Sequence, residues 1–282
     1  MSLKEIRSKA KLKPPIIVLY GTGGIGKTHF VTHMGRNVVR DSEFNIIAED
    51  VTKKEWEEGV EGENPIYPQD SVWLGTHGVI MVQTEDGIGK IECDHYECAA
   101  SWEEFMENLR ECIQRPHKIV GVDSLDWAEG LLWRHVCEQN GWAQIDTPAY
   151  GKGYVSALNE WKEYLSVVDE LRDAGKTVVQ IAHNEIKRYE DPTQDPMDRH
   201  QIKLHRKASD LIVEHADAVF FCARKLGTVS IKGKSGGMTT KVHKGERTIF
   251  TEDDPGYLAK NRYGLPPELP MDWEVIRKEM LK

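Results

Sequence analysis

A glycine-rich run close to the amino terminus has the residue types and the spacing of a phosphate-binding loop. It matches the Walker A pattern G-x-x-x-x-G-K-[ST] at every fixed position. Its residues are Gly21, Thr22, Gly23, Gly24, Ile25, Gly26, Lys27 and Thr28, and His29 follows. Glycines allow backbone N–H groups to turn inward towards a chain of phosphates. We therefore expect residues 21–29 to bind a nucleoside triphosphate, with Lys27 on the β- and γ-phosphates and Thr28 on Mg²⁺.

The neighbours of this run provide the strand–turn–helix context that the motif requires. The apolar residues 16–20 precede it and predict a buried strand. Val31, Met34 and Val38 recur at helical spacing after it, which predicts a helix that continues to about Arg40.

Polar side chains also stand at the ends of three later apolar runs. Glu85 follows residues 78–83, Asp123 follows residues 119–122, and His183 and Asn184 follow residues 177–182. In open α/β sheets, ligands bind at the carboxyl ends of the strands. We therefore expect these side chains to lie beside the phosphate loop.

Each of these side chains has a role in hydrolysis and an ordinary structural alternative. Asp123 has the position of a Walker B carboxylate, which contacts Mg²⁺ directly or through water, but it would also suit a helix cap. Glu85 could orient and deprotonate the attacking water, or it could be a turn carboxylate. His183 or Asn184 could contact the γ-phosphate, or serve the structure alone.

Composition and charge limit the class of protein. The chain has 282 residues, 39% of them apolar, which is enough for a large core. No run approaches the roughly 18 apolar residues of a membrane span, and the basic amino terminus lacks a secretory h-region. Five cysteines without a C-x-x-C pair argue against a disulfide framework. We expect a soluble protein of the cytoplasm.

The net charge of −9 is distributed unevenly along the chain. Residues 41–70 carry ten acidic and two basic side chains, whereas residues 224–247 carry seven basic side chains and one acidic. A basic face can therefore coexist with an acidic whole. We interpret residues 41–77, which also contain glycines and prolines, as an acidic surface insertion with one short helix near residues 54–58.

Apolar runs alternate with segments of helical periodicity over most of the chain. Expected strands cover residues 16–20, 78–83, 118–122 and 177–182, and expected helices cover residues 102–114, 127–139 and 155–174. This alternation predicts an α/β fold with a mostly parallel central sheet and helices on both faces. After Ala218, short β-like runs broken by glycines predict a C-terminal antiparallel β extension.

The segment 185–204 is predicted to be a long loop, because Pro192 and Pro196 interrupt it. With its flanks it carries six basic residues, which are Lys187, Arg188, Arg199, Lys203, Arg206 and Lys207. Basic residues with interleaved aromatic rings suit a single-stranded nucleic acid. The acidic residues of the same loop leave an ordinary solvated surface as the alternative.

Taken together, these motifs resemble the RecA-like ATPases of bacteriophages, the Sak-four-like single-strand annealing and recombination family. The resemblance covers nearly the whole chain except residues 41–77. It rests on residues 21–28, 83–87, 122–127, 150–154, 181–188 and 258–264. It implies a RecA-like core, ATP and Mg²⁺ as cofactors, self-association into a ring or filament, and binding of single-stranded DNA in the infected bacterial cell.

The resemblance also implies roles for individual residues. Glu85 takes the place of the catalytic glutamate. The loops after Asp146, which include Lys152, and after His183 take the place of DNA-binding loops. Lys260 and Arg262 look like paired cations that reach the γ-phosphate bound to a neighbouring subunit. The insertion 41–77 departs from the family pattern.

We divide the chain into a basic N-terminal segment (1–14), an ATPase domain (15–265) and a C-terminal tail (266–282). An ATP-dependent recombination ATPase that binds single-stranded DNA as an oligomer is the leading hypothesis. One alternative is a nucleotide-gated adaptor or loader that binds a protein partner through residues 41–77 with little turnover. Another is a small-molecule P-loop kinase, for which no Arg-rich lid is apparent.

Overall fold

The computed structural model describes residues 13–281, except 43–45, 50, 52, 62–64, 90, 92, 191–194 and 233–237. Side chains are not described at 36–38, 40, 46, 49, 73–77, 226–232 and 238–244. Most of the expected basic segment 1–14 lies outside the described residues. None of the helices within the described ranges combines the length and the apolar character that crossing a membrane requires.

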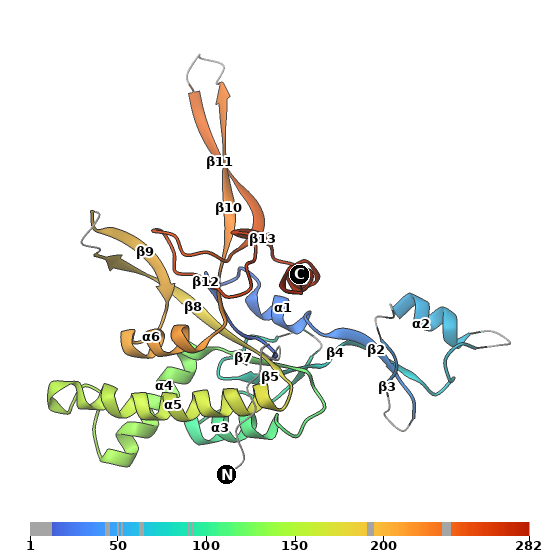
Figure 1. The fold of residues 1–282 in the computed structure, drawn as a ribbon, viewed down its shortest axis with the longest axis horizontal. Helices are drawn as coiled ribbons and strands as arrows, with labels where there is room; N and C mark the ends of the chain where they lie inside the picture. Colours follow the sequence, from blue (N-terminus) through green and yellow to red (C-terminus); the bar gives the residue numbers. More distant parts are fainter. Residues whose placement is uncertain are drawn as a thin grey trace, which may run out of the picture.

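A ten-stranded sheet forms the centre of the molecule (Figure 1). Eight of its strands lie in the order β13-β11-β10-β1-β8-β7-β5-β6, while β12 pairs with β10 and β9 pairs with β8 outside this order. The strands of its parallel part are β1 (Ile16–Gly21), β5 (Val79–Gln83), β6 (Asp94–His95), β7 (Ile119–Asp123), β8 (Thr177–Tyr189) and β10 (Ala218–Lys232). The antiparallel strands are β9 (Met197–Ile202), β11 (Met238–Phe250), β12 (Lys260–Asn261) and β13 (Glu268–Pro270). The predicted fold class is therefore confirmed.

Helices cover both faces of this sheet. The helices of one face are α3 (Trp102–Glu111), α4 (Leu125–Asn140), α5 (Lys152–Asp173), which follows the short 3-10 turn η1 (Ala149–Gly151), and α6 (Arg206–His215). The opposite face is covered by α1 (Lys27–Thr32) and α7 (Trp273–Met280). Successive residues of β1 alternate between these two cores: Ile16 belongs to the first and Ile17 to the second. All six residues of β1 are buried, which explains its continuous apolar sequence.

The predicted helix 29–40 is wrong beyond Thr32. The chain leaves the helix at His33 and forms β2 (Arg36–Arg40), which pairs antiparallel with β3 (Ile46–Glu49) and β4 (Val72–His77). Val39, which is fully buried, packs into this three-stranded sheet. Strand pairing with distant residues therefore overrides the helical spacing of the local sequence. The small sheet and α2 (Lys53–Val60) stand apart from the main body as a lobe (Figure 1).

The predicted loop 185–204 is instead a β-hairpin. Residues Asn184 to Tyr189 of β8 pair antiparallel with Met197 to Ile202 of β9. This pairing satisfies backbone groups that a long loop would leave to solvent. Pro196 lies just before β9, and Pro192 lies outside the described residues.

The C-terminal β extension is one long hairpin of β10 and β11 rather than several short strands (Figure 1). The expected tail 266–282 is also part of the fold. β13 pairs with β11, and α7 places the fully buried Ile276 in the core on the α1 face. The Asp272 carboxylate caps α7 by accepting from the backbone N–H groups of Glu274 and Val275.

This packing predicts that Ile276→Ala lowers the free energy of unfolding by about 2 to 5 kcal/mol, because it leaves a cavity in the core. Urea denaturation of the full-length chain measures the change. Leu281→Ala is the control, since Leu281 is 71% exposed and should change stability by less than about 0.5 kcal/mol. Equal, negligible effects of both substitutions would show that α7 is a dispensable tail.

Candidate functional site

The glycine-rich loop connects the carboxyl end of β1 to the start of α1. Gly24 and Gly26 have φ angles of 74° and 102°, which side chains other than glycine rarely adopt. Thr22, Gly23 and Gly24 are exposed. The Lys27 ammonium group donates to the carbonyl oxygens of Gly21 and Thr22, at 3.0 and 3.3 Å. The sequence-predicted phosphate loop therefore folds as a curled, accessible loop with a lysine at its centre.

The Lys27 side chain is a buried cation. It is only 5% exposed, and burial lowers the pKa of its ammonium group. The ammonium group donates to neutral carbonyl oxygens, while Asp123, Asp126 and Glu85 act only as more distant charges. An anion in the loop would compensate the desolvation of this ammonium group.

A direct contact joins the predicted magnesium ligands Thr28 and Asp123. The Thr28 hydroxyl donates to the Asp123 Oδ2 at 2.6 Å, and Asp123 is 1% exposed. Burial raises the pKa of the Asp123 carboxyl to about 6, although the Thr28 hydrogen bond opposes this. The two side chains come from α1, which follows β1, and from β7; β8 lies between β1 and β7 in the sheet.

The surroundings of this contact fit a magnesium ion. A Cβ on Gly87 would lie 2.9 Å from Asp123 Oδ2 and 3.4 Å from Thr28 Oγ1. The glycine therefore leaves space beside these two oxygen atoms. A hydroxyl and a carboxylate, completed by phosphate oxygens and water, form the donor set that Mg²⁺ prefers. Among the described residues no three His, Cys, Asp or Glu side chains form a metal cluster.

Glu85 lies at the end of β5, and the preceding residue fixes its position. The Thr84 hydroxyl donates to the Ser124 carbonyl oxygen at 2.7 Å and accepts from the Ser124 N–H at 3.0 Å. The Thr84 N–H donates to the Asp123 carbonyl oxygen at 2.7 Å. These bonds join the ends of β5 and β7, so Glu85 and Asp123 hold fixed relative positions. Sequence reasoning missed Thr84, whose only signal is its place before Glu85.

His183 extends the site on the neighbouring strand β8, where it lies in register with Gly21. Its Nδ1 is 3.8 Å from Glu85 Oε1 and 3.1 Å from Asp126 Oδ2. The His183 backbone N–H also donates to Asp126 Oδ1 at 3.0 Å. Asn184 contacts His200 instead, at 2.8 Å. Of the two predicted candidates, the structure therefore brings His183 to Glu85.

Asp126, in the first turn of α4, was missed by sequence reasoning. The hydrogen bond to Asp126 raises the pKa of the His183 imidazole. Burial opposes ionisation of Asp126, but the hydrogen bonds from the His183 ring and backbone outweigh it and lower the pKa of this carboxyl to about 2. The pair therefore favours an imidazolium next to a carboxylate. The sequence signal was present in Val122–Trp127, where Asp126 follows Asp123 by three residues.

Asp126 also connects the site to the basic residues near the β8–β9 hairpin. Lys203 Nζ lies 3.6 Å from Asp126 Oδ2. The His205 ring stacks on Tyr154 with centroids 4.3 Å apart, which brings the start of α6 beside the start of α5, where Lys152 lies. These contacts gather residues from both predicted DNA-binding segments in one region.

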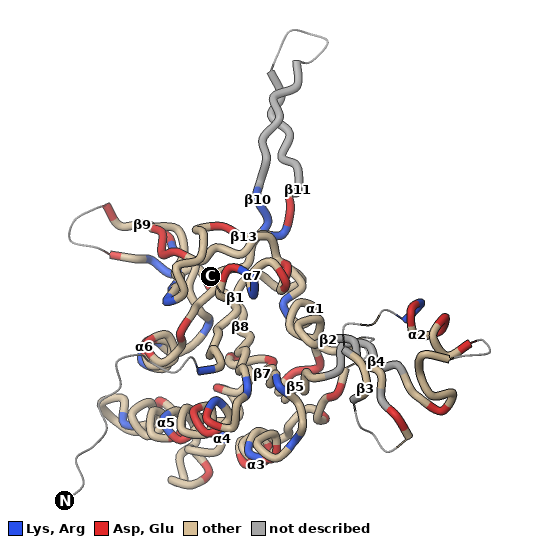
Figure 2. Tube along the Cα trace, turned by 45° about the vertical axis from the view of Figure 1, so that its right-hand side comes forward, with Lys and Arg blue, Asp and Glu red and all other residues tan. Residues whose placement is uncertain are grey.

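A cavity of about 600 Å³ lies under the hairpin in this region and is lined in part by Lys187, Arg188 and Arg206. Lys187 Nζ donates to the Leu204 carbonyl oxygen at 3.3 Å, and Lys207 follows Arg206 in α6. Basic and acidic segments alternate along this side of the molecule (Figure 2). We name the exposed or half-buried cations of this region the basic surface: Lys152, Lys187, Arg188, Lys203, Arg206 and Lys207.

Arg199 does not belong to the basic surface. Its side chain is 7% exposed, forms an ion pair with Asp253, and donates to the Tyr257 carbonyl oxygen at 3.0 Å. Its guanidinium also lies over the Tyr189 ring, 4.8 Å from the centroid. The structure therefore buries Arg199 and pairs its charge with Asp253, so we do not include it in the basic surface.

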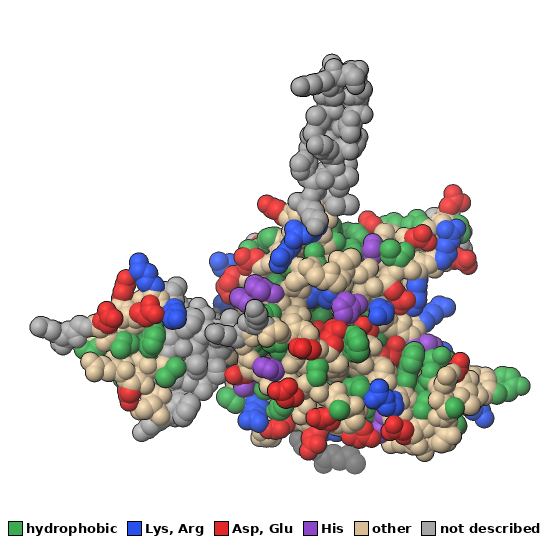
Figure 3. Space-filling view, turned by 180° about the vertical axis from the view of Figure 1, so that it is seen from behind, with side chains coloured by type: hydrophobic (Ala, Val, Ile, Leu, Met, Phe, Trp, Pro, Cys, Tyr) green, Lys and Arg blue, Asp and Glu red, His purple; other side chains and the backbone are tan. Residues whose placement is uncertain are grey.

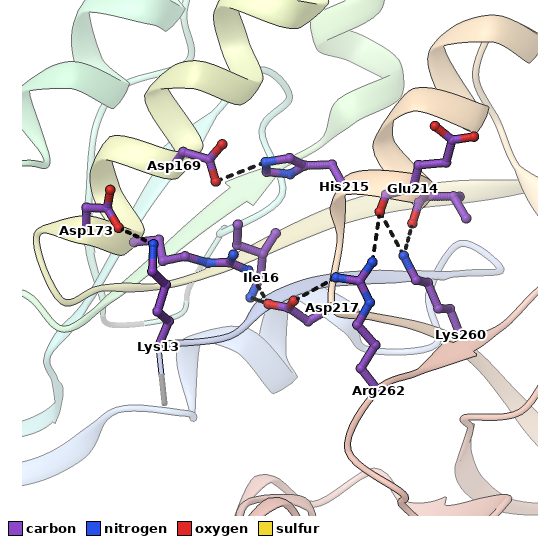
Figure 4. A network of polar contacts seen from close by, with 11 residues as sticks. Lys13, Ile16, Asp169, Asp173, Glu214, His215, Asp217, Lys260 and Arg262 are labelled. Carbon is purple, nitrogen blue, oxygen red and sulfur yellow. Dashed lines mark hydrogen bonds and ion pairs between the residues drawn. The ribbon is translucent and has the colours of Figure 1, made fainter. Parts of the chain in front are cut away.

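Lys260 and Arg262 lie at the amino ends of the strands, opposite to the end that carries the phosphate loop. β12 pairs there with the first two residues of β10, which runs parallel to β1. Lys260 Nζ donates to the carbonyl oxygens of Val213 and Glu214, at 2.7 and 2.9 Å. Arg262 Nη1 is 3.3 Å from Asp217 Oδ1 (Figure 4), and Asp217 also forms an ion pair with Arg172. Within one chain, the structure does not bring these two cations to Lys27.

A second cavity, of about 650 Å³, opens beside the phosphate loop. Thr22, Gly23 and Gly24 line one side, and the aromatic rings of Phe250 and Tyr257 line another. Small-molecule sites commonly have volumes of roughly 300 to 1,000 Å³. The loop therefore borders a space large enough for a nucleoside.

Comparisons with known proteins place this site in a family. Residues 72–263 match a family model described as an AAA domain, and the matched range begins after the phosphate loop. No curated protein matches the chain by sequence. The crystal structure of a KaiC-like protein from the hyperthermophilic archaeon Pyrococcus horikoshii is 11% identical with a TM-score of 0.36, over 84% of this chain and 78% of that chain. That likeness is too low to carry an argument. The family match covers more than half of the chain, and the protein therefore belongs to the AAA domain family.

Proposed function

We propose that this protein is a Mg²⁺-dependent ATPase that works as an oligomer and binds single-stranded DNA during strand annealing or recombination of the phage type. One observation carries the proposal. A series of polar contacts runs from Glu85, whose charge acts on Lys27 of the phosphate loop, through His183 and Asp126 to Lys203 on the basic surface. A change at the phosphates can thereby alter the charge balance at a surface suited to nucleic acid.

The residues around the loop have separate roles in the proposed hydrolysis. Lys27 binds the β- and γ-phosphates, and Thr28 and Asp123 would hold Mg²⁺, which supplies positive charge against the phosphate oxygens when bound. Glu85 orients the attacking water and accepts its proton. His183, held by Asp126, positions the Glu85 carboxylate. The nucleoside lies in the cavity lined by Phe250 and Tyr257.

Asp126 is the shared partner through which DNA binding and hydrolysis are coupled. Its carboxylate interacts with His183 on the nucleotide side and with Lys203 on the hairpin side. When a phosphodiester draws Lys203 away, Asp126 interacts with His183 alone. The pKa of the His183 imidazole then rises, which favours the imidazolium form beside Glu85. Binding on the basic surface is therefore expected to change the turnover rate.

Oligomerisation rests on Lys260 and Arg262 in this proposal. They lie away from the phosphate loop of their own chain, which supports a contact with the nucleotide of a neighbouring copy. Lys260 is held by neutral carbonyl oxygens, and Arg262 shares Asp217 with Arg172. A γ-phosphate from a neighbour would exchange these bonds for stronger charge-assisted ones.

The adaptor function is kept as an alternative because residues 36–77 form a separate lobe (Figure 3). Helix α2 exposes Glu55, Glu57 and Glu58, and Ile66 beside it is 80% exposed. An acidic surface with exposed apolar groups suits a basic protein partner.

The catalytic assignment predicts different defects for two substitutions. Lys27→Ala should abolish ATP binding, because it removes the central cation of the loop. Glu85→Gln should keep ATP affinity within about threefold but lower kcat by at least about 100-fold, because a general base is lost. Calorimetric titration and a phosphate-release assay measure the two quantities. Glu107→Gln, an exposed carboxylate of α3, is the control. Normal turnover of Glu85→Gln would exclude Glu85 as the base.

The raised pKa of Asp123, about 6, predicts a pH dependence of magnesium-assisted ATP binding. Above this pH the carboxylate is ionised and free to bind the metal, whereas below it Mg²⁺ must displace a proton. The apparent Mg²⁺ affinity should be flat near pH 7.5 and fall about tenfold per pH unit well below 6. Titrations of Mg²⁺ at saturating ATP between pH 5 and 8 test this. Asp123→Asn should remove the dependence, and a midpoint near pH 4 would contradict the assignment.

The basic surface predicts a specific defect in DNA binding. Arg188→Ala combined with Arg206→Ala should weaken single-stranded DNA binding and reduce the slope of log affinity against log salt by about 1.4, since two phosphate contacts are lost. Fluorescence anisotropy with an oligonucleotide at several salt concentrations measures both. Lys118→Ala with Lys278→Ala removes two exposed charges elsewhere and should leave the slope unchanged.

The same preparations decide between the two candidate functions. Wild-type turnover should rise when single-stranded DNA is added, and this rise should be lost with Arg188→Ala and Arg206→Ala. If single-stranded DNA leaves the turnover rate of the wild-type protein unchanged, the coupled ATPase is rejected and the adaptor is favoured.

A further inference from the structure

Two arginines lie directly opposite each other at the root of the β10–β11 hairpin, beside the phosphate loop. Arg224 of β10 and Arg247 of β11 are partners in the antiparallel register. The Arg247 Nη1 is 2.7 Å, and its Cζ 3.4 Å, from the position that a Cβ on Gly26 would occupy. The Arg247 guanidinium therefore packs directly on the backbone of the residue that precedes Lys27.

The position of Arg247 is fixed by its neighbours in the chain. Thr248 and Ile249, the next residues of β11, are 6% and 0% exposed. The Arg247 carbonyl oxygen accepts from the Met271 N–H at 3.1 Å, which ties this point of β11 to the segment that precedes α7. A side chain presented from such a rigid backbone can hold a ligand in a defined geometry.

The two guanidinium groups have no acidic partner within the part of the chain that the structure describes. Arg224 Nη1 donates to the Gly245 carbonyl oxygen at 3.1 Å, and neither arginine forms an ion pair there. The adjacent Lys225, by contrast, pairs with Glu268. Like charges directly opposite each other in an antiparallel pair are destabilising. The arrangement is therefore one that an anion between the loop and the hairpin would stabilise.

The groups that surround the loop on its two sides indicate which anion would bind there. The phosphate loop at the end of β1 lies between β10–β11 on one side and β8–β7–β5 on the other. Asp123 and Glu85 approach it from the second side, and Arg247 approaches it from the first. Arg247 also lies near His29, whose imidazole pKa is lowered first by desolvation and further by His33 and Arg247. A guanidinium matches two phosphate oxygens at once.

We propose that Arg247, with Arg224 beside it, is a second cationic subsite for the phosphate chain of the nucleotide held in the loop. This subsite rests on the proposed nucleotide binding and adds residues from the C-terminal hairpin of the same chain to it. The nucleotide then bridges the phosphate loop and the base of the hairpin. Nucleotide binding thereby becomes sensitive to the position of β11.

The test compares nucleotide affinity in Arg247→Ala, Arg247→Lys and the control Lys278→Ala. Calorimetric titration with ATP and with inorganic tripolyphosphate should show a loss of about 10- to 100-fold for Arg247→Ala with both ligands, because a charge-assisted bond is removed. Arg247→Lys should recover part of the affinity. Lys278→Ala should bind as the wild type does. Urea denaturation of each variant shows that it is folded, and Arg247→Gln replaces Arg247→Ala if the latter does not fold.

The outcomes separate this inference from the proposed function. Failure of the wild-type protein to bind ATP would reject both. ATP binding that is lost in Lys27→Ala but unchanged in Arg247→Ala would overturn the subsite alone. Unchanged ATP affinity together with weaker binding of single-stranded DNA would show that Arg247 contacts DNA, and would also overturn the subsite.

Discussion

The hydrogen bond from Thr28 to Asp123 is the interaction on which the site depends. It links the first turn of α1, which follows β1, to the end of β7, where Asp123 is 1% exposed. The bond is possible because β1, β8 and β7 are parallel and in register, so that their carboxyl ends meet at one level. The sheet is parallel because helices bury both of its faces. The contact between these two side chains therefore depends on the apolar content of the three strands β1, β8 and β7.

Three buried or half-buried carboxylates near this edge differ in pKa because their hydrogen bonds differ. Asp126 accepts from both the ring and the backbone of His183, and its pKa falls to about 2. Burial dominates at Asp123, where the pKa rises to about 6, and at Glu129, where it rises to about 7 although the His205 N–H donates to it. Asp126 contributes stability above its unfolded pKa and loses it as the pH falls towards 2. Of these three carboxylates, Asp126 keeps its negative charge to the lowest pH, which suits a residue shared between two cations.

The parts of this structure that sequence reasoning predicted are those determined by local pattern. Lys27, Thr28, Asp123 and Glu85 stand at fixed distances from apolar runs, and the runs themselves define the strand ends. The parts it missed depend on residues far apart in the chain. Helix α1 is short because β2 pairs with β4, whose sequence lies about thirty residues away. Segment 185–204 is a hairpin because β9 returns along β8, which its alternation of charged residues did not show. Arg199 is buried for the same reason. Asp126 belongs to the site because β8 brings His183 within hydrogen-bond distance of it.

The order of the strands also explains how one ligand could influence distant parts of the molecule. The phosphate loop sits in the middle of the sheet, and each side contributes groups of one kind: carboxylates from β5 and β7, and guanidinium groups from β10 and β11. A phosphate chain is stabilised by cations and by a metal that carboxylates hold. A bound nucleotide would therefore contact groups from both sides at once. Under the proposed function, hydrolysis would remove the phosphate next to Glu85 while the rest of the nucleotide would stay next to Arg247. Loss of the γ-phosphate would therefore release the side that leads to Asp126 and the basic surface before it releases the C-terminal hairpin.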